Sequence, residues 1–343
     1  MLRGIPTETA CSDGAMTFCN HRHREPDHSL LDDRSRSLID AMAAAEVPSY
    51  TQLSPHALRR GHEDYFFPLS LPERDLADLA VEHIPGRAGG ELRLWIYRPV
   101  ERAPAPLPCV VFYHGGGLMV GSLELYDSIC QRLCQRSGAV IVSVDYRLSP
   151  EHKFPAAHED ALTALQWVAE HVSALGVDPE RLAVGGDSGG GLLAAAMSQL
   201  SQDGRAPALA FQMLIYPFLG RRRDYPSYRD YSSGFFGSSR QLAWFIASYM
   251  SYPDELEDPQ LCPLLARRFD GLPPTFVLTA GFDMLRNEAE HYVALLQQAG
   301  VAVQLSCYQS TFHPFLNAAG YLEVGRAAID ECAERLRLAL ASP

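Results

Sequence analysis

The sequence lacks the features of membrane-spanning and nucleic-acid-binding proteins. No apolar run in its 343 residues approaches the ~18 residues that a membrane-spanning helix needs. Basic residues are few, with 29 Lys and Arg against 41 Asp and Glu, so the formal net charge is −12. Nucleic-acid phosphates are bound by clustered cations, and we interpret the one dense basic run, at residues 221–223, as a solvated loop. We therefore expect neither a membrane span nor a nucleic-acid partner.

Cysteine and histidine are not arranged for cross-linking or for metal binding. The eight cysteines include no Cys-x-x-Cys pair, and the first 25 residues lack the apolar core of a secretory leader. We therefore expect buried free thiols rather than a disulfide framework, in a cytoplasmic protein. His21 and His23 have no second cluster of ligands nearby, so the sequence predicts no metal ion and no cofactor.

The composition is that of a globular protein, with 47% hydrophobic and 20% charged residues. Residues 1–28 are polar and show no periodic pattern, which predicts a disordered arm. A helix is predicted over residues 30–45, where the proline at position 48 follows its end, and loop with a short helix is expected over 49–80.

From residue 91 onward, strand and helix patterns alternate. Residues 91–100 alternate apolar and polar side chains, which predicts a half-buried strand near a sheet edge. Helical spacing recurs at 161–168, 289–296 and 329–340. More uniformly apolar strands are expected over 109–113, 139–144, 181–184, 209–216 and 275–279, and residues 303–308 form a further strand-like run. The alternation predicts an α/β fold with a mostly parallel, doubly wound sheet and helices on both of its faces.

A nucleophile motif stands at residues 186–190, which read Gly-Asp-Ser-Gly-Gly and match the pattern G-x-S-x-G. The apolar run that ends at Val184 precedes the motif, and a run of small helix-forming residues follows from Leu192. Strand, sharp turn and helix in this order present a serine nucleophile, and glycines remove the Cβ atoms that would clash in the turn. A phosphate-binding turn is the alternative, but the P-loop lysine is missing. Ser188 is therefore the candidate nucleophile.

A serine hydroxyl needs a base, and the order Ser, acid, His leaves few candidates. His313 follows the strand-like run 303–308, at the sheet edge where catalytic loops gather, whereas His291 is interpreted as a surface residue on a helix. Asp283 directly follows the strand predicted over 275–279. We expect His313 to act as the base and Asp283 to orient its imidazole.

A second glycine motif, His-Gly-Gly-Gly at residues 114–117, directly follows the strand predicted over 109–113. Successive glycine N–H groups can point at one position and stabilise an oxyanion. We assign this oxyanion hole to the N–H groups of Gly116, Gly117 and Gly189. The His114 side chain is interpreted as an organiser of the loop rather than as a base.

Taken together, these motifs resemble those of the hormone-sensitive-lipase-like esterases, bacterial family IV. The resemblance rests on residues 114–117 (HGGG), 145–151 (DYRLSPE), 186–190 (GDSGG), 283–286 (DMLR) and 313–315 (HPF), in the family's order. It implies an α/β-hydrolase fold and a carboxylesterase activity. The chain departs from the family at Gly189, Leu192 and Asn287, where Ala, Asn and an acid are usual. We expect the extra glycine to loosen the turn at the serine.

The resemblance also implies a division of the chain. Residues 29–80 and 217–263 would form a helical cap, and residues 81–216 and 264–343 the catalytic domain. Members of the family often dimerise through the last strand of the sheet, so a homodimer is a possible partner state. The segment 217–263 is rich in aromatic residues, and apolar pockets are commonly lined by such side chains. The candidates for the substrate pocket, which could also only pack the cap onto the core, are Tyr231, Phe235, Phe236, Trp244 and Phe245.

We therefore expect a serine carboxylesterase that hydrolyses short- to medium-chain acyl esters of small molecules. The same three groups also serve amidases, arylformamidases and deacetylases, which the sequence separates poorly from esterases. A third hypothesis is a non-catalytic binder of small molecules, as in the related gibberellin receptors of plants. Those receptors have lost the triad histidine, whereas His313 is present here, which favours an enzyme.

Overall fold

The computed structural model describes residues 28–45, 50–72, 76–87, 89–100, 106–220, 224–235 and 237–341. The disordered arm predicted over residues 1–28 lies outside these ranges except for its last residue. The basic run at 221–223 and Phe236 also lie outside them.

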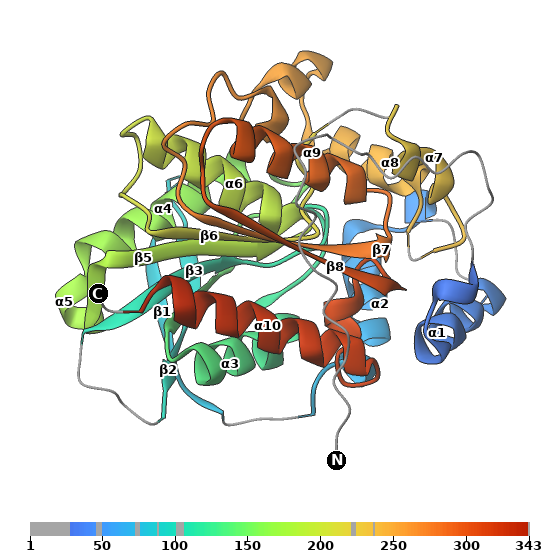
Figure 1. Cartoon of the computed structure of the whole chain (residues 1–343), viewed down its shortest axis with the longest axis horizontal. Coiled ribbons are helices and arrows are strands. Elements are labelled where there is room, and N and C mark those ends of the chain that lie inside the picture. The colour runs from blue at the N-terminus through green and yellow to red at the C-terminus, as the bar shows by residue number, and fades with distance from the viewer. Residues whose placement is uncertain are drawn as a thin grey trace.

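One eight-stranded sheet forms the centre of the molecule (Figure 1). Its strand order is β1-β2-β4-β3-β5-β6-β7-β8. β2 runs antiparallel to both of its neighbours, β1 and β4, and β3 to β8 are parallel to one another. The strands are β1 (Ala77–Pro85), β2 (Glu91–Pro99), β3 (Leu107–Tyr113), β4 (Val140–Val144), β5 (Val177–Asp187), β6 (Phe211–Ile215), β7 (Thr275–Phe282) and β8 (Val303–Phe312). β4, β6 and β7 are buried along their whole length, as their uniformly apolar sequences predict.

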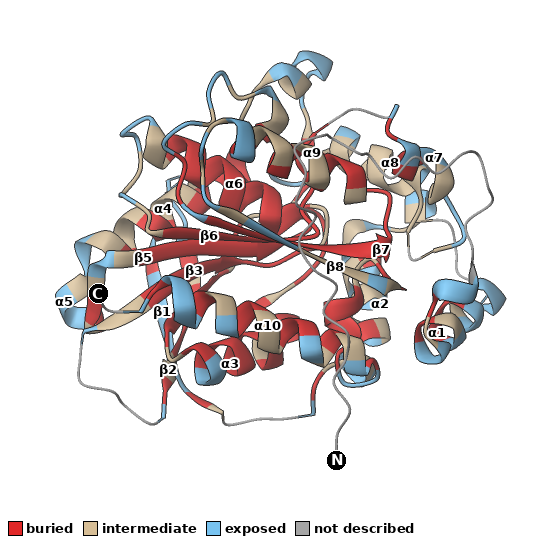
Figure 2. Ribbon diagram, in the orientation of Figure 1, coloured by how far each residue is buried: buried red, intermediate tan, exposed pale blue. Residues whose placement is uncertain are grey.

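Helices cover both faces of this sheet, which confirms the predicted fold class. α3 (Leu123–Ser137) and α10 (Glu323–Ala339) pack on one face. α4 (Ala156–Glu170), α6 (Gly189–Gln202) and α9 (Arg286–Gln298) pack on the other (Figure 1). Each face therefore has its own apolar core, and Figure 2 shows both as buried layers against the strands.

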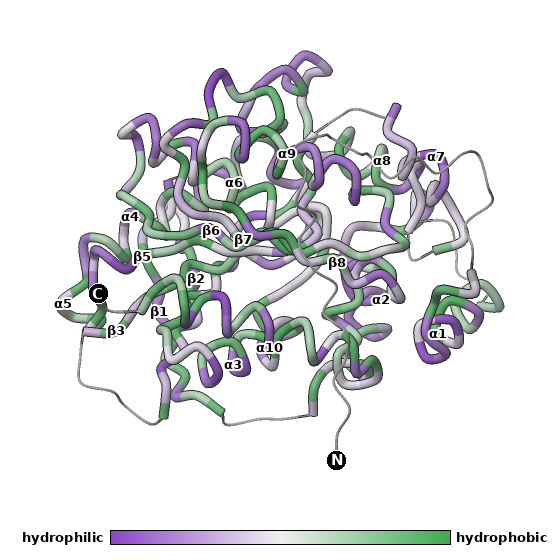
Figure 3. The backbone as a smooth tube through the Cα atoms, in the orientation of Figure 1, coloured by the Kyte–Doolittle hydropathy of each residue, from purple (hydrophilic) through white to green (hydrophobic). Residues whose placement is uncertain are grey.

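Local sequence signals set the ends of several helices. The Ser122 hydroxyl accepts a hydrogen bond from the N–H of Leu125 at the start of α3, and Gly138, with φ 71°, ends this helix. The helix predicted over 30–45 is α1 (Asp33–Ala44), where the Asp32 carboxylate accepts from the N–H of Ser35. Hydrophobic and hydrophilic segments alternate along α1 in Figure 3, as expected for a helix with one buried side.

Four helices gather near the carboxyl ends of the parallel strands (Figure 1). They are α1, α2 (Pro55–Phe66), α7 (Pro226–Asp230) and α8 (Ser239–Tyr249). They come from the two segments predicted to form a cap, although the division of the chain into cap and catalytic domain stays a prediction. The shorter elements are α5 (Val172–Leu175) and the 3-10 helices η1 (His28–Leu30), η2 (Tyr50–Gln52), η3 (Phe67–Leu69), η4 (Pro253–Glu257), η5 (Pro263–Leu265) and η6 (Phe315–Ala318).

The expectation for residues 49–80 was incomplete. Residues 49–80 were expected to contain only loop and a short helix, but they hold the twelve-residue helix α2 and the start of β1. β1 is the edge strand, and only Ala77 and Ile84 are buried along it, so its sequence carries little hydrophobic pattern. β2 lies next to this edge strand and alternates in burial, in agreement with the half-buried strand predicted near a sheet edge over 91–100.

In the described part of the chain, no helix is both long enough and apolar enough to cross a membrane.

Candidate active site

Ser188 stands in the sharp turn between β5 and α6. Its backbone has φ 53° and ψ −116°, a conformation that costs about 1–3 kcal/mol and is common at functional sites. The N–H of Ser188 donates to the carbonyl oxygen of Ile215 at 2.9 Å, which fixes the turn on the end of β6. A Cβ at position 190 would lie 1.9 Å from the carbonyl oxygen of Tyr113, so only glycine fits there. The second glycine of the motif is thus required by backbone contact.

His313 and Asp283 occupy the first positions after two neighbouring strands. β7 ends at Phe282 and β8 at Phe312, so both side chains start from the carboxyl edge of the sheet. The Oγ of Ser188 lies 3.0 Å from Nε2 of His313, and Nδ1 of His313 lies 3.0 Å from Oδ2 of Asp283. The other oxygen, Oδ1 of Asp283, accepts from the N–H of Leu285 at 2.8 Å. The structure therefore places the three predicted residues in one hydrogen-bonded chain.

The glycines assigned to the oxyanion hole lie against this serine. Gly116 and Gly117 have φ values of 116° and 60°, and a Cβ at position 116 would lie 2.1 Å from the carbonyl oxygen of Val120. A Cβ at position 189 would come within 3.1 Å of the Gly117 nitrogen, so the two backbones touch. No acceptor among the described residues takes a hydrogen bond from the N–H of Gly116, Gly117 or Gly189. These N–H groups are thus available to a ligand.

His114 organises the glycine loop, as the sequence indicates. Its Nδ1–H donates to the carbonyl oxygen of Gly115 at 2.7 Å, and its ring stacks on Tyr146 with centroids 4.3 Å apart. The Tyr146 hydroxyl donates to the carbonyl oxygen of His114 at 2.6 Å. Burial lowers the pKa of His114, so the imidazole is neutral in this position.

Arg59 on α2 holds the other end of the same loop, and the sequence analysis did not find it. Its Nε donates to the carbonyl oxygen of Met119 at 2.9 Å, and its Nη2 donates to that of Ser149 at 2.9 Å. Nη2 also pairs with the Glu151 carboxylate at 2.6 Å. The sequence around Arg59 holds no motif, and Arg59 lies 92 residues before its partner Glu151. The only signal for this contact was Glu151 itself, at the end of the motif 145–151.

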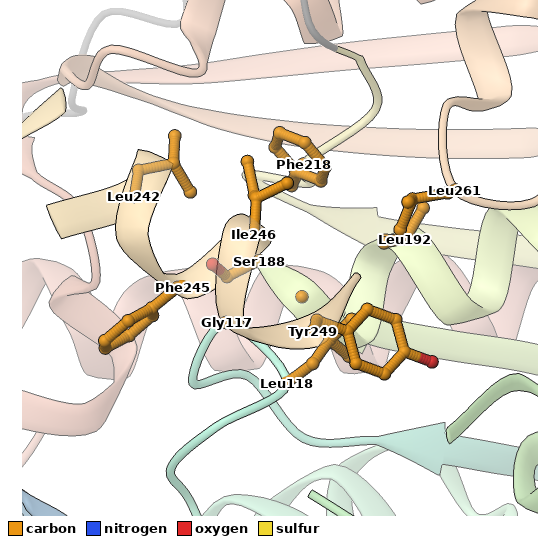
Figure 4. Close-up of a pocket in the computed structure, with 11 residues that line it drawn as sticks. Gly117, Leu118, Ser188, Leu192, Phe218, Leu242, Phe245, Ile246, Tyr249 and Leu261 are labelled. Atoms are coloured by element: carbon orange, nitrogen blue, oxygen red, sulfur yellow. The ribbon is translucent and has the colours of Figure 1, made fainter. Parts of the chain in front are cut away.

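A small apolar cavity of about 30 Å³ opens beside Ser188 (Figure 4). One wall is a stripe of α8 at helical spacing, made of Leu242, Phe245, Ile246 and Tyr249. The remaining lining comes from the catalytic motifs and from four apolar side chains: Gly117, Ser188 and Gly189, with Leu118, Leu192, Phe218 and Leu261.

Of the five aromatic residues proposed for the pocket, Phe245 lines this cavity. Tyr231 and Phe235 pack instead on Phe282, with ring centroids 5.7 and 5.3 Å away. Trp244 packs against Tyr50, with centroids 5.3 Å apart. Phe236 lies outside the described residues. An aromatic composition alone could not tell which side chains of the segment face the serine.

Two residues of α9 have different surroundings from those expected. His291 was interpreted as a surface residue, but it is half-buried and its Nδ1 lies 2.5 Å from the Tyr225 hydroxyl. Asn287, where the family usually has an acid, accepts the N–H of Ser227 through Oδ1 at 2.9 Å. The Asn287 amide therefore connects α9 to the start of α7. Burial raises the pKa of the neighbouring Glu288 well above its usual range.

No cluster of three or more His, Cys, Asp or Glu side chains that could hold a metal ion occurs among the described residues.

Known proteins with similar sequences are hydrolases. Residues 110–317 match a family described as the alpha/beta hydrolase fold. The chain is 42% identical over 249 residues to the carboxylic ester hydrolase LipN of Mycobacterium tuberculosis, an alignment that covers 71% of this chain and 65% of that protein. It is 38% identical over 239 residues to an ethyl acetate hydrolase of Pseudomonas putida, covering 69% of this chain and 75% of that protein.

Solved structures resemble the whole described fold. An alpha/beta hydrolase enzyme from the metagenome of Lake Arreo, Spain, superposes with a TM-score of 0.88 at 36% identity, covering 92% of this chain and all of that chain. A hyperthermophilic esterase from the archaeon Pyrobaculum calidifontis superposes with a TM-score of 0.83 at 38% identity, covering 91% and 99%.

Proposed function

The chain belongs to the alpha/beta hydrolase fold family, among the hormone-sensitive-lipase-like esterases, and is a carboxylic ester hydrolase; from this premise we propose that Ser188, His313 and Asp283 carry out the hydrolysis of short-chain acyl esters. The observation that carries the proposal is the hydrogen-bonded chain of these three groups, with 3.0 Å at each link, at the mouth of an apolar cavity. Nucleophile, base and orienting acid at these distances suit acyl transfer.

The first step forms an acyl-enzyme. With Nδ1–H of His313 donating to Asp283, the free Nε2 takes the proton of Ser188 as Oγ attacks the ester carbonyl carbon. The tetrahedral intermediate collapses, its bond to the alcohol oxygen breaks, and His313 returns the proton to the leaving alcohol. In the second step, water attacks the acyl carbonyl, with His313 again as base, and the carboxylic acid leaves as Oγ regains its proton.

Backbone N–H groups stabilise the negatively charged oxygen of the tetrahedral intermediate. We assign it to the N–H groups of Gly116, Gly117 and Gly189, each donor of this kind contributing about 3–4 kcal/mol to the transition state. Gly189 is also the first residue of α6, so the positive end of the helix dipole lies behind the reacting carbon. Both contributions are already in place before the substrate binds.

The size of the cavity supports acyl chains at the short end of the expected range. A volume of about 30 Å³ holds two or three groups the size of a water molecule, at about 10–15 Å³ each. We expect kcat/KM for p-nitrophenyl esters to be highest for acetate to butyrate and to fall steadily toward octanoate. Turnover of no ester in this series would contradict the proposed function.

A smaller side chain in the cavity wall should shift the preferred acyl-chain length upward. Ile246 is half-buried on α8 and lines the cavity, so Ile246→Ala should increase the preference for hexanoate over acetate about tenfold with little loss of stability. Arg240→Ala, an exposed change on the same helix, is the matched control and should leave the ratio unchanged. The same ratio in both variants would mean that the acyl chain lies elsewhere.

We also propose a homodimer formed through β8. This strand ends the sheet, and Gln304 and Leu305 are exposed along it, so its backbone edge can pair with a second copy about a twofold axis. Sedimentation velocity should give a single dimeric species, and Leu305→Lys should shift it toward the monomer. A monomer at micromolar concentration would overturn this part of the proposal.

The cytoplasmic location is retained as a proposal. Five described cysteines are free thiols, of which Cys307 is half-buried and Cys109, Cys130, Cys134 and Cys332 are buried. A reducing compartment maintains thiols in this state, which supports the proposal.

A further inference from the structure

A buried carboxylate that the proposed mechanism does not use lies next to the nucleophile. Asp187 precedes Ser188 at the end of β5 and is 1% exposed. Its Oδ2 accepts the Tyr126 hydroxyl at 3.0 Å. The backbone of Gly115, in the oxyanion loop at residues 114–117, lies against the same oxygen and favours the ionised carboxyl group, whose other oxygen, Oδ1, has no hydrogen-bond partner among the described residues. One side chain thus connects the turn that carries the serine to the loop that carries the oxyanion donors.

This contact leaves no room for adjustment. A Cβ at position 115 would lie 2.4 Å from Oδ2 of Asp187 and 2.7 Å from the Tyr126 hydroxyl. The loop backbone therefore rests directly on the carboxylate, and the position of Gly116 and Gly117 follows from it. We therefore expect a change at Asp187 to move the donors that face the substrate.

The tyrosine and cysteine side chains around Asp187 are neutral. Burial raises the pKa of every tyrosine and cysteine that interacts with it, so these side chains stay protonated. They come from α3, the loops after β4 and β6, and α10: Tyr126, Cys130, Tyr146, Tyr216 and Cys332. The imidazole of His313 faces the carboxyl group from the loop after β8. Asn317, on η6, contacts the Tyr126 hydroxyl.

Burial raises the pKa of Asp187 to about 6, against the lowering effects of Tyr126, His313 and Gly115. Because the folded-state pKa lies above the ordinary value, ionisation of Asp187 destabilises the folded state, and this loss is complete above about pH 6. A buried charge next to the nucleophile therefore lowers the free energy of unfolding. Such a cost is common where function requires the charged group.

We propose that Asp187 is a positioning residue whose ionised carboxylate holds the oxyanion loop, through Gly115, against the turn at Ser188. The inference rests on the proposed function, because it assigns Gly116 and Gly117 to the oxyanion. Hydrogen bonds to a charged acceptor are about twice as strong as those to a neutral one. Protonation therefore loosens the loop and lowers kcat, while substrate binding in the apolar cavity and KM are unaffected.

The test is the pH dependence of kcat. Tyr126→Phe removes a donor that stabilises the ionised form, so the acidic fall in kcat should move about one unit to higher pH, with near-normal kcat at pH 9. Asp187→Asn keeps an acceptor for Gly115 but no charge, so kcat should fall about tenfold with KM unchanged. In the Asp187→Asn background, Tyr126→Phe should no longer move the profile.

Controls separate this role from a structural one. Tyr97→Phe removes a bond of the same kind, from a buried hydroxyl to Asp127 at 3.1 Å, and should leave the profile unchanged. Asp187→Asn should melt at or above the wild-type temperature, because it removes a buried charge. An unshifted profile in Tyr126→Phe, or an Asp187→Asn variant with wild-type kcat at every pH, would overturn the inference. A wild-type protein without Ser188-dependent ester hydrolysis would instead overturn the proposed function.

Discussion

Replacing Ser188 by alanine should lower kcat for p-nitrophenyl acetate by about 10⁴-fold or more, with KM little changed. The Oγ atom forms the bond to the acyl carbon, and no other hydroxyl is hydrogen-bonded to Nε2 of His313 among the described residues. Activity above the uncatalysed rate would come only from the oxyanion donors and from binding. The measurement is the steady-state rate, together with mass spectrometry of the wild type after treatment with a phosphonate ester, which should label Ser188.

Ser198→Ala is the matched control for this change. Ser198 is also on α6 and fully buried, but its hydroxyl donates to the carbonyl oxygen of Ala194, one turn earlier in the helix. It should retain wild-type kcat. A Ser188→Ala enzyme with more than a tenth of wild-type kcat would remove the serine from the mechanism.

Asp283→Asn should cost about 10⁴-fold in kcat without unfolding the protein. The N–H of Leu285 holds Oδ1 of Asp283, so an asparagine here keeps its oxygen on Leu285 and turns its amide NH₂ toward His313. The Nδ1 atom must then accept, and the proton of the neutral ring moves to Nε2. This tautomer cannot take the proton of Ser188. Steady-state kinetics measure the loss of kcat, and a melting curve for each variant shows whether the protein remains folded.

Two comparisons make this second test specific. Asp270→Asn changes an exposed aspartate that precedes β7 and should have no effect on kcat. The double variant Ser188→Ala/Asp283→Asn should be no slower than Ser188→Ala alone, because groups that act as a unit are not additive. Only a small loss in Asp283→Asn would shift the orienting role to Asp187, the other carboxylate that interacts with His313.

The sequence predicts those site residues best whose identity is required by close contacts of the backbone. The sites at residues 114–117 and 186–190 could be found because glycine is required by contacts such as the one between position 190 and Tyr113, and because each motif follows an apolar strand. Asp283 and His313 could be found because each follows a parallel strand directly. Parallel strands end at one edge, so local patterns were enough to predict that these groups meet.

The cavity could not be predicted in the same way. Aromatic content drew attention to Trp244 and Tyr231, but the wall is set by the side of α8 that faces Ser188. The spacing Leu242, Phe245, Ile246, Tyr249 was the available signal, since these positions share one face of a helix. Arg59 had no local signal, because its partners Met119, Ser149 and Glu151 lie 60 to 92 residues away.

The attachment of α2 has a consequence for motion. Its Leu58 belongs to a third, small apolar cluster with Met119 and Val120, separate from the two cores that cover the sheet. Segments held by few buried contacts open at a fraction of the free energy of global unfolding. Phe66 anchors the other end of α2 in one of the main cores, so an opening confined to Leu58 and Arg59 would free the end of the oxyanion loop while that core stays intact. We therefore expect the Arg59 contacts to govern how often the catalytic geometry is lost and regained within the native state.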